Sequence, residues 1–243
     1  VGGFVGTSTI GITDSIFRLS KGHGIELEVG SGFSGFARNT FSDNDNYALR
    51  IGVEQRGIID ADTTFDGEGA LAGIELMGGT VTSAQTWGDL KDDAVTSITD
   101  HFNVNTRLEI EPGVTLLFDD NKGMTVDGRA DGILVAVGTE ENPITMSRLG
   151  EVIWKGVWID NSEASANRLE HVTIEYAGFS AFEDNNRAAL SIGGFVGVSA
   201  INVVQCTFAN SAGAGIYIKA DSVVNVDIAT VNTFTDNAGA DII

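Results

Sequence analysis

The segment GGFVG occurs twice in this chain, at residues 2–6 and again at residues 193–197. When the chain is aligned with itself at this offset of 191 residues, Phe17 aligns with Phe208. Most other identities in the alignment fall on glycines and apolar residues. The mismatches are mostly polar, which is the way two copies of a duplicated fold diverge. Such a duplication restricts the chain to folds that are built by repeating one structural unit.

A second pair of matching segments extends this duplication. NTFSDN at residues 39–44 matches NTFTDN at residues 232–237 after a slip of two residues. We therefore expect residues 1–51 and residues 192–243 to be equivalent. Within each copy, neighbouring phenylalanines of the pattern are about 24–26 residues apart, a spacing within the range of one solenoid coil.

The middle of the chain consists of short apolar runs that favour strands. LEIEPG, VTLLF, MTVDG, ILVAVG, ITMS and GVWID are each bounded by Gly, Asn or Asp, residues that are typical of turns. A β-sandwich would need longer alternating strands, and a propeller would need a blade signature about every 40 residues. Helical periodicity is nearly absent, and TWGDLKDDAVTSI at residues 86–98 is the one segment that permits a helical turn.

These patterns predict an all-β chain that folds as a parallel β-helix, or solenoid, with little or no helix. We expect a single domain over residues 1–243, in which roughly ten coils at about 4.8 Å each form a rod of about 50 Å. Inward apolar side chains would stack from coil to coil, and Asn and Gly would turn the corners. Residues 53–100 fit this plan least well and are expected to be the least regular segment.

The central segment carries a family resemblance. Its specific parts are the IEPGV turn, the VGTEENPI turn and the WKGVWI strand, all within residues 108–178. This segment resembles the bacterial right-handed parallel β-helix repeat proteins of the pectate-lyase-like superfamily, and residues 1–51 and 188–243 are similar to the generic repeat of that superfamily. The resemblance implies a right-handed coil. It does not imply one activity, because this fold carries lyases, hydrolases, adhesins and passive spacers.

The charge of the chain restricts its partners. The formal net charge is −20, and a nucleic-acid-binding surface would instead need a basic footprint. No apolar run approaches the length of about 20 residues that a membrane span needs. The single cysteine, Cys206, rules out an internal disulfide but not secretion, because a large core needs no disulfide.

One acidic turn is a candidate calcium site. DADTTFDGEG at residues 60–69 places Asp60, Asp62 and Asp66 at alternating positions, and Ca²⁺ prefers carboxylate oxygens. The match to a calcium loop is partial, because Phe65 stands where an EF-hand loop needs glycine. Asp60, Asp62 and Asp66 are therefore the candidate metal ligands, and calcium is the candidate cofactor. The alternative is an acidic surface turn.

Two segments resemble parts of catalytic sites, and neither gives a predicted catalytic residue. GHG at residues 22–24 resembles the histidine motif of polygalacturonases, but the other motifs of that family are missing, and the internal copy has Ala214 in place of His23. We interpret His23 as a turn residue. A lyase site would need carboxylates on successive coils with an Arg or Lys base, and the candidates are Asp119, Asp120, Asp127 and Asp131 with Arg129. The favoured interpretation is that those carboxylates lie on a pair of solvent-exposed turns.

Trp154 and Trp158 lie four residues apart in WKGVWI. In a strand both side chains would point to the same face, where they could stack on a sugar or pack against the protein. The family resemblance favours packing.

The ends of the chain suggest what it binds. Val1 aligns with Ile192, and Ile243 aligns near Arg50, so both positions lie inside a coil. An open solenoid end exposes apolar residues and unpaired strand edges. Three interpretations fit: a window from a tandem array with a period near 191 residues, a subunit that stacks end to end, or a truncation of one longer β-helix.

We therefore predict a structural or adhesive repeat unit of an extracellular or cell-surface fibre, without enzymatic activity. Its partners would be further copies, either covalently linked in tandem or associated end to end. The alternative is a carbohydrate-active β-helix, either a polysaccharide lyase or a sugar-binding module, whose partner would be a polysaccharide.

Overall fold

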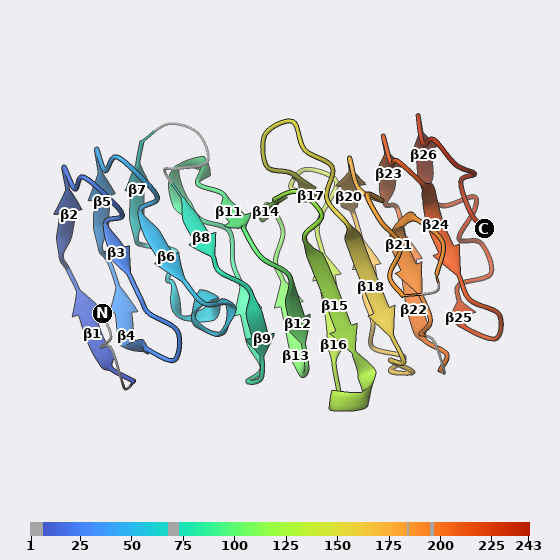
Figure 1. Ribbon diagram of the computed structural model, residues 1–243, viewed down its shortest axis with the longest axis horizontal. Coiled ribbons are helices and arrows are strands. Elements are labelled where there is room, and N and C mark those ends of the chain that lie inside the picture. The colour runs from blue at the N-terminus through green and yellow to red at the C-terminus, as the bar shows by residue number, and fades with distance from the viewer. Residues whose placement is uncertain (1–6, 68–72, 184, 195–196) are drawn as a thin grey trace.

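The computed structural model describes residues 7–67, 73–183, 185–194 and 197–243, which wind into the elongated solenoid of Figure 1. All pairs of neighbouring strands are parallel, and about 5% of the chain is helical. The predicted all-β parallel β-helix is confirmed, but it has about eight turns rather than roughly ten. The coil count was wrong because long connections, such as residues 149–155 and 176–187, add residues without adding turns.

One long sheet runs along the whole solenoid and is flanked by four shorter ones. The nine-stranded sheet contains β3 (Ile25–Glu26), β6 (Leu49–Ile51), β8 (Ile74–Leu76), β11 (Thr96–Ile98), β14 (Thr115–Phe118), β17 (Ile144–Arg148), β20 (Val172–Glu175), β23 (Thr207–Ala209) and β26 (Thr233–Thr235). At the N-terminal end, the other two faces are the pair β1 (Thr9–Thr13) and β4 (Gly32–Ala37), and the three strands β2 (Ile16–Arg18), β5 (Thr40–Ser42) and β7 (Thr64–Asp66).

Two six-stranded sheets form the other faces over the rest of the chain. The first contains β9 (Gly79–Val81), β12 (Phe102–Val104), β15 (Gly123–Asp127), β18 (Gly156–Asp160), β21 (Ala188–Ile192) and β24 (Ala214–Ile218). The second contains β10 (Gln85–Trp87), β13 (Arg107–Ile110), β16 (Ile133–Val137), β19 (Arg168–Glu170), β22 (Ala200–Val204) and β25 (Val223–Val224).

The core consists of inward side chains that lie above one another in register. Phenylalanine rings stack at both ends of the chain: the Phe17–Phe41 centroids are 5.2 Å apart, and the Phe208–Phe234 centroids are 5.5 Å apart. Phe65 continues the first of these stacks. Stacking like on like helps to fill the interior, because successive coils of one stack present similar cross-sections to each other.

Residues in the left-handed region bend the chain before and after the phenylalanine strands. Asp14 and Leu19 flank β2 and have φ angles of 49° and 57°. Gln205 and Asn210 flank β23 in the same way, at 54° and 53°. A single left-handed residue turns the backbone sharply, so a pair of them confines each strand to three residues.

Asparagine side chains connect neighbouring coils at these corners. Asn39 Oδ1 accepts a hydrogen bond from the Ser15 N–H (3.1 Å), and Asn39 Nδ2 donates to the Ile12 carbonyl (3.1 Å). Asn44 bonds in the same way to the backbone of Ser20 and Phe17. The amides thus bond backbone groups at the corners, where no strand ladder bonds them.

The second NTF segment makes the same set of hydrogen bonds. Asn232 accepts from the Cys206 N–H (2.8 Å) and donates to the Val203 carbonyl (2.9 Å). Asn237 accepts from the Ser211 N–H and donates to the Phe208 carbonyl. These four partners lie 191 residues after the partners of Asn39 and Asn44. The repeated segments therefore form the same local structure, although GGFVG itself lies partly outside the described residues.

Residues 53–100 contain a change of faces. The β1–β4 sheet ends before this segment at Ala37, and the sheet of β2 ends within it at β7. The two six-stranded sheets begin at β9 and β10, and only the nine-stranded sheet continues through. The 3₁₀ turns η1 (Val53–Ile58) and η3 (Lys91–Asp93) lie in this segment. The buried guanidinium of Arg56 donates to Thr96 Oγ1 (3.2 Å) and to the Gly88 carbonyl (2.7 Å), which ties η1 to the following coil.

As a result of this change, matching strands lie on different faces. β2 and β23 carry the matching residues Phe17 and Phe208, yet β2 is in the three-stranded sheet and β23 is in the nine-stranded sheet. Likewise β3 lies in the nine-stranded sheet, whereas its counterpart β24 lies in a six-stranded one. The equivalent coils are thus displaced by one face around the solenoid axis.

The corner amides should contribute measurably to stability. Replacing Asn39 with alanine leaves the Ser15 N–H and the Ile12 carbonyl without their partner, so we expect the free energy of unfolding to fall by about 1–3 kcal/mol. Urea denaturation followed by circular dichroism measures this change. The matched control is Asn186→Ala at an exposed position, where we expect a change below about 0.5 kcal/mol. Equal losses in both variants would contradict the role of the amide.

Candidate functional site

A long connection crosses the outward side of the sheet that contains β15, β18 and β21. This connection, residues 176–187, is called the strap here, and it joins β20 to β21. The Phe179 N–H donates to the Trp154 carbonyl (3.0 Å), and Ser180 Oγ donates to Asn121 Oδ1 (2.7 Å). Arg187 Nε donates back to the Gly178 carbonyl (2.9 Å). The first two bonds hold the strap against the preceding coils, and the third joins the two ends of the strap.

An aromatic and basic cluster lies beneath the strap. The Phe182 ring is buried, with its centroid 5.4 Å from that of Trp158 and 4.6 Å from Lys155 Nζ. Trp158 Nε1 donates to the Gly193 carbonyl (2.9 Å), and only 6% of the residue is exposed. Trp158 therefore packs against the protein, and its face is closed to a sugar ring.

Trp154 is also buried, but it does not share a face with Trp158. It precedes β18, stacks on Phe118 in the core with a centroid distance of 4.2 Å, and donates from Nε1 to the Glu175 carbonyl. The expected packing role agrees with these contacts, whereas the expectation of one shared face was wrong because Trp154 lies outside the strand.

His101 lies at the edge of the cluster under the strap. Its Nε2 is 3.0 Å from Thr125 Oγ1, and its ring centroid is 6.2 Å from that of Phe182. Burial lowers the pKa of His101 to about 4, and the positive charges of Lys155 and Lys122 act in the same direction. The carboxylate of Asp100 opposes this shift but also pairs with Lys122 at 3.0 Å. His101 is therefore neutral at physiological pH.

Two carboxylates occupy the same position on neighbouring coils of this sheet. Asp127 and Asp160 are partners in the β15–β18 register, and Arg129 pairs with both: Nε is 3.1 Å from Asp127 Oδ1 and Nη2 is 2.8 Å from Asp160 Oδ2. Asn161 Nδ2 donates to the other oxygen of Asp160. The Asp160 side chain is only 2% exposed, and its burial raises its pKa although Arg129 favours the charged form.

This arrangement limits the chemistry of the pair. Both oxygens of Asp160 accept hydrogen bonds, and Asp127 Oδ1 also accepts from the backbone N–H of Arg129. A general acid or base needs an atom within reach of its substrate, whereas Asp160 is closed off by Arg129 and Asn161. The cluster mainly fixes η4 (Gly128–Ala130), the 3₁₀ turn that follows β15.

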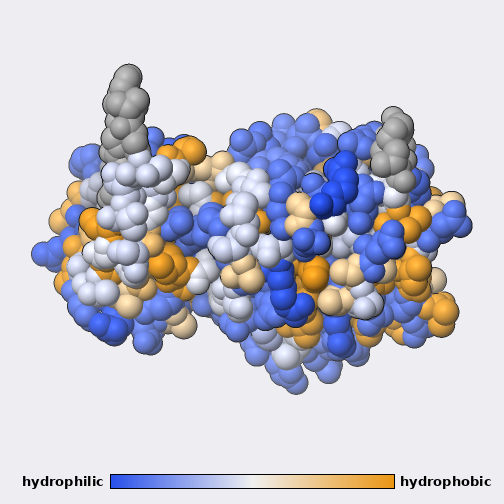
Figure 2. Space-filling model, turned by 90° about the horizontal axis from the view of Figure 1, so that it is seen from below, coloured by the Kyte–Doolittle hydropathy of each residue, from blue (hydrophilic) through white to orange (hydrophobic). Residues whose placement is uncertain are grey.

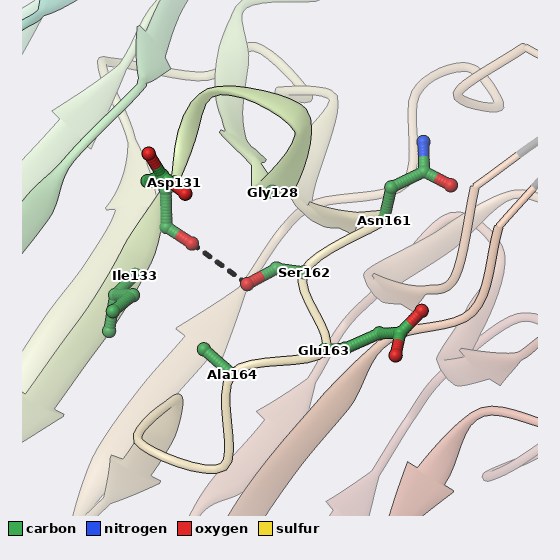
Figure 3. A pocket seen from close by; sticks show the side chains of 8 residues that line it. Gly128, Asp131, Ile133, Asn161, Ser162, Glu163 and Ala164 are labelled. Atoms are coloured by element: carbon green, nitrogen blue, oxygen red, sulfur yellow. Dashed lines mark hydrogen bonds between the residues drawn. The ribbon is translucent and has the colours of Figure 1, made fainter.

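A cavity of about 350 Å³ lies beside this cluster, between the turn after β15 and the turn after β18 (Figure 3). Ser162 Oγ donates to the Gly132 carbonyl (2.8 Å) across the cavity wall, and it accepts from Asn167 Nδ2 (2.7 Å). Asp131 and Glu163 supply the carboxylates of the lining. The Ser162 hydroxyl bonds backbone and amide groups, and the lining contains no histidine that could activate it.

The predicted calcium ligands are not gathered into one site. Asp60 Oδ1 accepts from the backbone N–H and the hydroxyl of Thr63, while Asp60 Oδ2 accepts from the Arg38 N–H (2.9 Å). Asp62 and Asp66 are exposed. Over the described residues, no three His, Cys, Asp or Glu side chains form a metal-binding group. Calcium binding at these residues stays a prediction that calcium titration can test.

The lyase-type carboxylates are also separated. Asp119 and Asp120 lie at the corner before β15, whereas Asp127 and Asp131 lie at its other end. His23 is half-buried, stacks on Tyr47 with a centroid distance of 6.1 Å, and lies 3.4 Å from the side-chain amide of Asn46. Of these residues, only Asp127 belongs to the cluster of Asp127, Arg129 and Asp160.

Comparisons of the chain with known proteins identify no relative. No protein-family model, no curated protein and no solved structure matches the chain. In the part of the chain that the structure describes, no helix has the length and hydrophobicity of a membrane span.

Sequence reasoning missed the strap and the burial of Phe182 and His101. The signal that could have revealed the strap is its length, because twelve residues between two strands exceed the usual corner of this solenoid. Nothing in the sequence pairs Ser180 with Asn121, which are 59 positions apart.

The low pKa of His101 should make stability depend on pH. The unfolded chain binds a proton near pH 6.5, but the folded chain binds it only near pH 4, so stability should fall as pH decreases through that window. We expect His101→Gln to flatten this decline, because glutamine does not titrate. Urea midpoints measured between pH 7 and pH 4 give the two slopes.

Thr125→Val is the matched control for that measurement. It removes the hydrogen-bond partner of His101 but keeps the buried imidazole, so it should lower stability without flattening the pH dependence. An identical slope in wild type and His101→Gln would show that His101 does not contribute.

Proposed function

We propose that this chain is a structural or adhesive repeat unit of an extracellular or cell-surface rod, built into a tandem array or an end-to-end fibre. The observation that carries this proposal is the hydrophobic core, which runs without a break from the N-terminal coils to the C-terminal ones. A solenoid with a continuous core and short corners is stiff along its axis. Stiffness and length are the properties that a spacer or surface fibre needs.

Two further observations support the proposal. The formal net charge of −20 keeps a long rod soluble and discourages side-by-side association. The resemblance of residues 108–178 to bacterial right-handed parallel β-helix repeat proteins of the pectate-lyase-like superfamily favours the same handedness here and is compatible with an extracellular location. Calcium bound by exposed carboxylates would add to the stability of such a rod.

The equivalence of the two ends makes a tandem array testable. Ile242 forms a parallel bridge with Ile216, just as Leu49 pairs with Ile25. Ile242 therefore corresponds to Leu49, and the position after Ile243 corresponds to Ile51. We expect a chain of residues 1–243 followed directly by residues 51–243 to form one rod about twice as long, with a single unfolding transition. Small-angle X-ray scattering and urea denaturation measure both properties.

A control for the fusion inserts a flexible Gly/Ser linker of about ten residues at the junction. That chain should scatter as two hinged bodies. If the direct fusion scatters in the same hinged way, the repeat does not continue the solenoid. If the chain of residues 1–243 is itself compact rather than elongated in solution, the proposed rod is wrong.

A carbohydrate-active β-helix is the second candidate function. The specific observation in its favour is the cavity beside Asp127, Arg129 and Asp160, because two carboxylates and an arginine on adjacent coils are groups that bind sugar hydroxyls and uronates. Against a catalytic role, Asp160 is already bonded through both oxygens.

The lyase alternative has a direct assay. Incubation with uronate-containing polysaccharides, with and without Ca²⁺, should give no new absorbance at about 235 nm, because Asp160 is bonded through both oxygens and Asp127 is paired with Arg129. Turnover that disappears in Arg129→Gln would replace the structural proposal with the enzymatic one. A known lyase in the same buffer is the positive control.

A further inference from the structure

Five threonines stand in one row on the outward side of the nine-stranded sheet. The strand register pairs Thr115 with Thr145, Thr145 with Thr173, Thr173 with Thr207 and Thr207 with Thr233. Their strands β14, β17, β20, β23 and β26 are consecutive neighbours in that sheet (Figure 1). This row is called the threonine ladder here, and it extends over five successive coils.

The threonine side chains point away from the core. Successive residues of a strand face opposite sides of a sheet, and the residue after each threonine packs in the core: Leu116, Met146, Ile174, Phe208 and Phe234. The first four threonines are half-buried within the row, and Thr233 is exposed. Because neighbouring strands lie about 4.8 Å apart, the ladder presents one hydroxyl and one methyl group at each such step.

The ladder hydroxyls are not used to fasten the coils. Among the residues that the structure describes, none of the five hydroxyls has a hydrogen-bond partner. Elsewhere in the chain, by contrast, Thr64 Oγ1 donates to Thr40 Oγ1 on the preceding coil (3.1 Å), and Thr99 Oγ1 donates to Glu75 Oε1 (2.8 Å). A row that only stabilised the sheet would gain from such bonds between its members. Its hydroxyls instead remain able to donate to and accept from a group outside the protein.

The surface around the ladder is nearly uncharged, although the chain carries a formal net charge of −20. The second outward position of the same five strands holds Leu117, Ser147, Glu175, Ala209 and Thr235. Glu175 is the one charged residue of these ten outward positions, and it accepts a hydrogen bond from Ser147 Oγ (2.9 Å).

The rest of the surface has a different character. At the other end of the same sheet, the outward residues in register are Glu26, Arg50 and Glu75. Hydrophilic residues are also spread over the side of the molecule that Figure 2 shows. The uncharged strip over β14 to β26 is therefore a local feature of this face and not a property of the whole surface.

We propose that the threonine ladder binds the surface of an ice crystal. Ice and liquid water consist of the same molecule, so a protein can distinguish them only by the regular spacing of the crystal. The ladder repeats at the strand spacing of about 4.8 Å, which is close to one repeat of the oxygen positions in hexagonal ice. This activity goes beyond the proposed structural role and does not depend on it.

The chemistry of threonine suits this partner. A hydroxyl both donates and accepts, so it can take the place of a water molecule in the lattice. The β-branched side chain is stiff at χ1 and loses little rotamer freedom when it is bound. A crystal surface without net charge matches an uncharged row, because a charged side chain would have to give up its own hydration at a cost in free energy.

The core beneath the ladder keeps its spacing fixed. Phe118 in β14 stacks on Trp154 with a centroid distance of 4.2 Å, and Phe208 in β23 stacks on Phe234 at 5.5 Å. Because the five threonines are held on one rigid frame, binding of one positions the others. Contacts that are individually weak then act together, as in multivalent binding.

The test places a long charged side chain in the middle of the ladder. We expect the wild-type protein to slow ice recrystallisation and to hold the freezing point of a seeded sample below its melting point. Thr173→Lys should lose most of both activities, because the lysine keeps the neighbouring threonines from the ice surface. The matched control is Thr86→Lys, which changes an exposed threonine in β10, outside the ladder, and should keep both activities.

Circular dichroism and urea midpoints establish that each variant folds. If Thr173→Lys does not fold, Thr207→Lys tests the same row at the next coil. A direct readout is the uptake of fluorescently labelled protein into a growing ice crystal, which the wild type should show and the ladder variant should not.

The outcomes separate this proposal from the structural role. A wild-type protein without any effect on ice in these assays overturns the proposal. Full activity in Thr173→Lys, or an equal loss in Thr86→Lys, shows that the ladder is not the binding site and also overturns it. None of these results changes the shape of the molecule, so small-angle X-ray scattering tests the rod independently.

Discussion

The bond between a corner asparagine and the backbone of the preceding coil is the interaction on which this solenoid depends. A parallel ladder bonds the backbone only within the strands, so corner N–H and carbonyl groups need other partners. Asn39 and Asn232 supply both an acceptor and a donor to their preceding coils. Because the amide fixes the distance and the register between coils, the inward phenylalanines come to lie directly above one another.

The polar groups on the face beneath the strap are likewise bonded within the protein. Beneath the strap, His101 is neutral and close to Thr125, and Asp160 is bonded by Arg129 and Asn161. Reactive sites usually leave a perturbed group exposed to a substrate. Here His101 and Asp160 are each bonded to neighbouring side chains, which is why the face supports a structural interpretation better than a catalytic one.

Sequence patterns were sufficient for the repeating features and insufficient for the unique ones. The spacing of Phe17 and Phe41, and the match of NTFSDN to NTFTDN, led to a parallel solenoid because each coil obeys the same local rules. The strap is held by long-range contacts such as that between Ser180 and Asn121, and the buried Arg56 ties η1 to the following coil in the segment where the faces change. Single long-range contacts leave no periodic signal in a sequence, so neither feature was predicted. The coil count was too high because long connections add residues without adding turns.

The displacement of equivalent strands by one face has a geometric consequence for any array of such repeats. β2 and β23 carry the same motif on adjacent faces of the solenoid. In a series of repeats, a given surface feature would move to the next face with every unit and return to its first orientation after three. The rod would therefore display its features along a screw, and a flat partner such as a cell wall would meet each of them only once in every three repeats.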